Sequence, residues 1–63
     1  MKLKEARKAS GLLQSELAGR LNVTQSAVAR WETGKNPPLK KYHKLIARAL
    51  RVSEADIDEL KEK

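Results

Sequence analysis

The sequence predicts an all-α domain, and three observations lead to that prediction. Apolar residues recur three or four positions apart along most of the chain, which is the spacing of one face of an α-helix. No segment alternates apolar and polar residues as a half-buried strand does. Glycine, asparagine and proline divide the helical stretches into short pieces. We therefore expect one compact domain of about five short helices over residues 1–63.

The first two helices are expected over about residues 2–10 and 14–21. Gly11 is a typical residue to end the first. Glu16 lies where a capping box places an acid, but Leu13, at the N-cap position, has no side-chain oxygen. Helix 2 should therefore begin without a side-chain cap.

The third helix is expected from the N-cap Thr24 to about Thr33, with Gly34 ending it. Asn22 lies in the preceding turn, because asparagine tolerates a left-handed backbone. Val28 and Trp31 should face the core. Positions 25 and 29, and 26 and 30, then form two outward rows of polar or small residues.

Pro38 suits the first turn of a fourth helix, and Ser53 with Asp56 resembles a capping box that begins a fifth. Ile57 and Leu60 should be inward residues of that fifth helix, and residues 61–63 should fray. The fourth helix has a broad apolar face, which comprises Leu39, Tyr42, His43, Leu45, Ile46, Ala49 and Leu50.

Composition narrows the function. There is no cysteine, which excludes disulfides and zinc fingers, and no apolar run long enough to span a bilayer. We therefore expect a soluble, cytoplasmic protein with no metal, cofactor or small-molecule substrate. The net charge is +6, which divides into +9 over residues 1–52 and −3 over residues 53–63. The basic part should face nucleic-acid phosphates, and the acidic end should point away.

The segments Leu12–Ala18, Asn22–Lys35 and Ile46–Ser53 together resemble the Cro/phage-repressor (Xre-type) helix-turn-helix family. The resemblance implies a lambda-repressor-like fold of five helices that binds double-stranded operator DNA, usually as a homodimer. It implies that four residues of the third helix contact bases: Gln25, Ser26, Ala29 and Arg30. The residues that would contact phosphates are Gln14, Thr24, Lys35 and Asn36. Arg7 and Glu32 match positions that form a buried ion pair.

Three residues depart from the family pattern. Leu13 replaces a polar cap, Asn22 replaces a glycine, and Arg51 stands where a glycine commonly terminates the fourth helix. An arginine there is strained if its backbone is left-handed.

The simplest function is a transcriptional regulator, most simply a repressor that acts by occupying its operator. The alternative is an antitoxin or coactivator-type module that uses the same fold to bind a protein, which a surface-exposed Leu13 would favour. One histidine, no cysteine and no clustered carboxylates on the folded core argue against an enzyme. Trp31 should be a core residue and His43 a structural one.

Two further features have open roles. Tyr42 either packs in the core or reaches a phosphate or a partner subunit. A run of basic residues in the fourth helix is either a solvated face or a track for the DNA backbone; it comprises Lys40, Lys41, Lys44 and Arg48.

Overall fold

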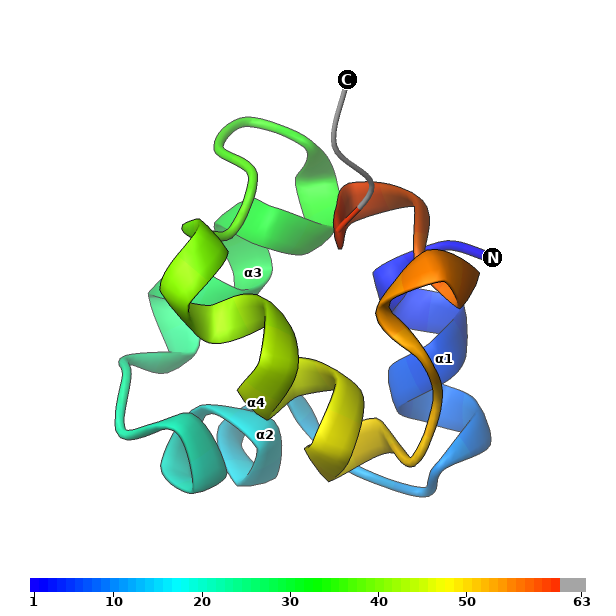
Figure 1. Ribbon diagram of the computed structural model, residues 1–63. Coiled ribbons are helices and arrows are strands. Elements are labelled where there is room, and N and C mark those ends of the chain that lie inside the picture. Colours follow the sequence, from blue (N-terminus) through cyan, green and yellow to red (C-terminus); the bar gives the residue numbers. More distant parts are fainter. Residues whose placement is uncertain (61–63) are drawn as a thin grey trace.

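The computed structural model describes residues 1–60 and confirms an all-helical fold in that part of the chain. Its elements are α1 (Leu3–Ala9), α2 (Gln14–Leu21), α3 (Gln25–Thr33), α4 (Lys40–Leu50) and two 3-10 turns, η1 (Glu54–Asp56) and η2 (Asp58–Leu60). In the view of Figure 1, α4 crosses the middle of the molecule, with α1 on the right, α2 at the lower left and α3 behind its upper part. Within residues 1–60, no helix has the length and apolar character needed to cross a membrane.

Two boundaries differ from the sequence prediction. The expected fifth α-helix is replaced by η1 and η2, with Ile57 extended between them (φ −108°, ψ 120°) and fully buried. Pro38 does not lie in the first turn of α4; that helix begins at Lys40, after the N-cap Leu39. The predicted fraying of residues 61–63 lies outside the described residues.

One apolar core joins the four α-helices to η2 and to Ile57, which lies between the two 3-10 turns. It is formed by the buried side chains Leu3, Ala6, Leu17, Ala18, Leu21, Val28, Trp31, Ile46, Leu50, Ile57 and Leu60. Trp31 is thus a core residue, as predicted, and its ring centroid lies 5.6 Å from that of the half-buried Tyr42. The expectation that Leu39 and Leu45 face inward is wrong, since they are 62% and 44% exposed.

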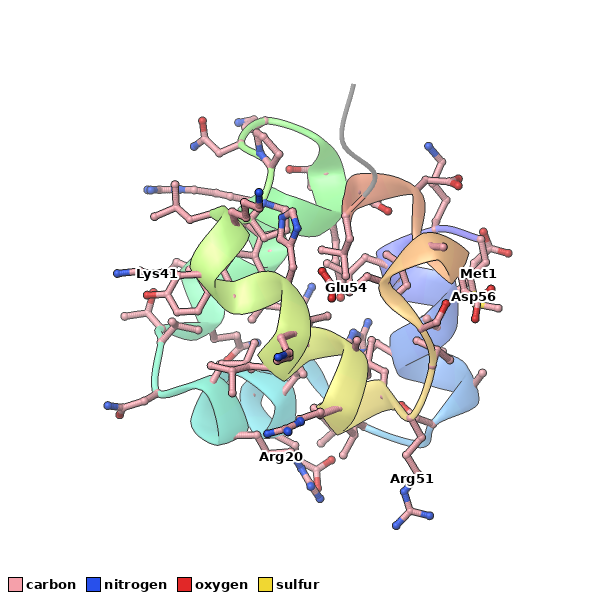
Figure 2. The ribbon with its side chains drawn as sticks, in the orientation of Figure 1. Met1, Arg20, Lys41, Arg51, Glu54 and Asp56 are labelled. Atoms are coloured by element: carbon pink, nitrogen blue, oxygen red, sulfur yellow. The ribbon has the colours of Figure 1, made fainter. Side chains whose placement is uncertain are left out.

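The two ends of the described chain are fastened together. The Met1 ammonium donates to the Asp56 carbonyl at 2.7 Å, and the Asp58 amide donates to the Met1 carbonyl at 2.8 Å. The Leu3 amide donates to Glu59 Oε1 at 2.8 Å. Figure 2 shows Met1 and Asp56 beside one another at this edge. The acidic segment is therefore held against the start of α1.

Left-handed residues end three of the helices. Asn22 (φ 57°) ends α2, Gly34 (φ 81°) ends α3 and Arg51 (φ 57°) ends α4. Asparagine and glycine adopt this conformation at little cost, whereas other L-residues pay about 1–2 kcal/mol. Arg51 is therefore the one of these three whose side chain does not suit its backbone.

We expect Arg51→Gly to raise the free energy of unfolding by about 0.5–1 kcal/mol, because relief of the left-handed strain exceeds the extra chain entropy of glycine. Urea denaturation measures it. Arg51→Ala is the matched control: it removes the same charge but keeps a Cβ, so it should not stabilise. Equal stabilisation by both variants would attribute the effect to charge rather than to the backbone.

Leu13 is 64% exposed at the start of α2, and its backbone amide already donates to Glu16 Oε1 at 2.9 Å. Only this half of a capping box forms, because leucine offers no acceptor. Leu13→Thr should add the other half and stabilise the fold by about 1 kcal/mol. Urea melts should show no such gain for Leu13→Ala, which removes the same apolar surface without adding a hydroxyl.

Candidate nucleic-acid interface

The helices α2 and α3 are joined by a short, locally specified turn. The Val23 amide donates to the Ala18 carbonyl at 3.0 Å, which closes the end of α2 over the left-handed Asn22. The chain then enters α3 through Thr24, whose Oγ1 accepts from the Ala27 amide at 3.2 Å. This hydrogen bond confirms Thr24 as the N-cap of α3. The geometry is a helix-turn-helix, with α3 as its second helix.

The outer surface of α3 is polar and accessible. Gln25, Ser26 and Arg30 are exposed, and Ala29 is half-buried. Val28 and Trp31 on the opposite side are buried in the core. The outer surface of α3 therefore carries two planar hydrogen-bonding groups, the amide of Gln25 and the guanidinium of Arg30. The small residue Ala29 lies on the same surface.

A buried ion pair fixes α3 to α1. Arg7 Nε donates to Glu32 Oε2 at 2.6 Å and its Nη2 to Glu32 Oε1 at 3.4 Å, while Nη1 donates to the Leu12 carbonyl at 2.7 Å. The two side chains are 8% and 3% exposed. Removing two charges from water is costly unless each is paired and hydrogen-bonded, and this geometry satisfies both conditions.

The ion pair continues into a hydrogen-bond chain that reaches the surface. Gln14 Nε2 donates to Glu32 Oε1 at 3.0 Å, and Gln25 Nε2 donates to Gln14 Oε1 at 3.4 Å. The residues thus brought together come from α1, α2 and α3. Sequence reasoning missed this link, because an acid on α3 and a glutamine at the start of α2 share no local pattern; only the helix packing places them together.

The other residues predicted to contact phosphates lie apart from these hydrogen bonds. Lys35 and Asn36 are exposed in the loop after α3, and Thr24 is exposed at the N-cap of that helix. The buried His43 anchors the far end of this loop, since its Nε2–H donates to the Pro38 carbonyl at 3.1 Å. His43 therefore has a structural contact here, and the loop is held at both ends by helices.

The basic run on α4 is exposed, and one of its lysines contacts an aromatic ring. Lys41 Nζ lies 5.2 Å from the centroid of the Tyr42 ring, within cation–π range. Tyr42 packs against Trp31 and so belongs to the edge of the core rather than to an open surface. Of the two interpretations of this tyrosine, core packing is the one that these contacts support.

We expect Glu32→Ala to lower the free energy of unfolding by about 3–5 kcal/mol, because it leaves the buried Arg7 guanidinium unpaired. Thermal melts should show a much smaller effect for Glu5→Ala, since Glu5 is exposed and its carboxylate only accepts from the Lys2 amide at 3.2 Å. The double change Arg7→Met with Glu32→Leu should recover much of the loss, because an apolar pair has no charge to desolvate. A cost below about 1 kcal/mol for Glu32→Ala would show that the pair behaves as a solvated one.

Comparison with known proteins gives a family. A family model described as Helix-turn-helix matches residues 3–57, which spans all four α-helices and η1. The searches of curated proteins and of solved structures found no match. The matched region contains the capped turn, the exposed face of α3 and the buried ion pair described above. The chain belongs to the Cro/C1-type helix-turn-helix family of DNA-binding transcription regulators.

Proposed function

We propose that this protein is a repressor that occupies a double-stranded operator as a homodimer, with α3 of each copy in the major groove. The observation that carries the proposal is the chain of hydrogen bonds from the buried Arg7–Glu32 pair through Gln14 to Gln25. It links a surface amide of α3 to the buried pair and favours one orientation of that amide. A side chain that is already oriented loses less entropy on binding, which favours recognition of a fixed pattern.

The base-contacting set in this proposal is Gln25, Ser26, Ala29 and Arg30. The amide of Gln25 has a donor and an acceptor, which match adenine N7 and N6, and the guanidinium of Arg30 matches guanine O6 and N7. Ala29 leaves room for the groove wall or contacts a thymine methyl. Ser26 donates or accepts as its neighbour requires.

The phosphate-contacting set is Gln14, Thr24, Lys35 and Asn36. Gln14 and Thr24 lie at the starts of α2 and α3, where free backbone amides and the helix dipole favour an anion. Lys35 and Asn36 follow α3 in an exposed loop. Contacts on both sides of α3 would fix its register in the groove without reading sequence. In a symmetric pair, the two recognition helices would lie about 34 Å apart.

A second candidate function is supported by one observation, the exposure of Leu13 (64%). An apolar side chain at the surface is commonly a protein contact when it belongs to a patch. Leu13 immediately precedes Gln14, so a protein partner bound there would cover part of the same surface as DNA. The two functions are therefore separable by asking which ligand this surface binds.

We test the proposal by selecting duplexes from a random-sequence pool and measuring gel shifts on the selected operator and a scrambled duplex. Gln25→Ala and Arg30→Ala should each lower the ratio of the two affinities about tenfold or more, because each removes one base contact worth about 1–3 kcal/mol. Selection on each variant should show relaxed preference at one base position. Lys4→Ala removes an exposed charge from α1 and should leave the ratio unchanged.

Two outcomes would contradict the proposal. Unchanged affinity ratios for both variants would mean that α3 does not read bases. The salt dependence supplies the second: about four phosphate contacts per copy imply a slope of log affinity against log salt near −3.6. A slope near zero would remove the phosphate contacts and leave the protein-partner function.

A further inference from the structure

A second surface of the molecule has no role in the proposed DNA contact. It is an open hollow of about 580 Å³ between the ends of α1, α2 and α4. Its floor is made of small or apolar side chains, among them Ala9, Leu12, Ala49 and Val52. Such a floor can receive an apolar side chain from another molecule.

Two arginines border this hollow. Arg20 and Arg51 are both exposed, and neither forms an ion pair among residues 1–60. Figure 2 shows both side chains extending from the same lower edge of the molecule. None of the residues that line the hollow carries a carboxylate. The surface thus combines an apolar floor with uncompensated positive charge.

The backbone of Arg51 is a second and independent observation. Its φ of 57° is left-handed, a conformation in which glycine is relaxed and arginine is strained. Residues held in sparsely populated backbone conformations cluster at functional sites. A long cationic side chain held at the rim of a hollow, on a backbone that does not suit it, points to a ligand for that side chain.

The hollow is distinct from the DNA-reading surface. Gln14 begins α2, whereas Arg20 lies six residues later, about 9 Å along the helix axis and on a different face. Arg51 ends α4 at the opposite end from the loop that carries Lys35. A partner in the hollow would therefore leave the surface of α3 free.

We propose that this hollow docks an acidic segment of a partner protein, with an apolar side chain on the alanine floor and carboxylates on Arg20 and Arg51. The hollow is open, whereas a small-molecule site usually encloses most of its ligand, so the hollow suits a peptide segment better. A second copy of this chain fits less well, because acids among its residues 1–60 already have partners. Asp56 accepts from the Ser53 amide, Glu59 accepts from the Leu3 amide, and Glu54 faces His43 at 3.9 Å.

The test uses the whole chain labelled with nitrogen-15 and a synthetic probe. The probe is a 12-residue helical peptide, acetylated and amidated, with two leucines on one face flanked by two glutamates. Titration should give saturable amide shifts at the floor of the hollow, including Ala9 and Ala49. Arg20→Ala and Arg51→Gly should each weaken binding about tenfold, the loss expected for one charge-assisted contact. Arg51→Gly is the sharper variant, because glycine suits that backbone and misfolding cannot explain a loss.

The controls separate docking from simple charge attraction. Lys4→Ala removes one positive charge from α1 away from the hollow and should change the affinity less than twofold. Peptides with glutamine for glutamate, or serine for leucine, should not saturate. Failure of the acidic peptide to bind, or equal binding of its serine version, would overturn the proposal. Stronger shifts of the same amides by a scrambled DNA duplex would also overturn it and assign the hollow to nucleic acid.

Discussion

The buried pair between Arg7 and Glu32 is the interaction on which the rest of the structure depends. It joins α1 to α3 at the two positions where the family resemblance implies an ion pair. All three nitrogens of the guanidinium donate, two to Glu32 and one to the Leu12 carbonyl. A buried charge pair adds little or no net stability over an apolar pair of similar volume, but the loss of one partner is costly because it leaves the other charge unpaired. The pair therefore holds α3 against α1.

Hydrogen bonds connect the exposed surface of α3 to that pair. Glu32 accepts from Gln14 as well as from Arg7, so the start of α2 is tied to the same carboxylate. This series of hydrogen bonds ends at Gln25, on the exposed side of α3. In a domain of this size, net stability is only a few kcal/mol. The proposed DNA-reading surface lies on such a scaffold, and these hydrogen bonds tie it to the buried pair.

Charge is divided among three regions of the fold. The proposed DNA surface carries Arg30 and Lys35, and the hollow between α1 and α4 carries Arg20 and Arg51. Two acidic residues after position 53 instead lie at the start of the chain: Asp58 Oδ1 lies 3.6 Å from the Met1 ammonium, and Glu59 Oε1 accepts from the Leu3 amide. These carboxylates are therefore engaged by groups of the same molecule. Both basic surfaces consequently remain open to anionic partners.

The sequence by itself determined the helices and their ends, because these depend on neighbours in the chain: Thr24 caps α3, and Asn22 and Gly34 adopt the left-handed turns. The family resemblance in the sequence also implied the helical fold that the structure shows. Only the tertiary structure decided the rest. It exposed Leu39 and placed Gln14 on Glu32, since both depend on how the helices pack. It also replaced the fifth helix by two 3-10 turns, because burying Ile57 in the core requires an extended residue where an α-helix would continue.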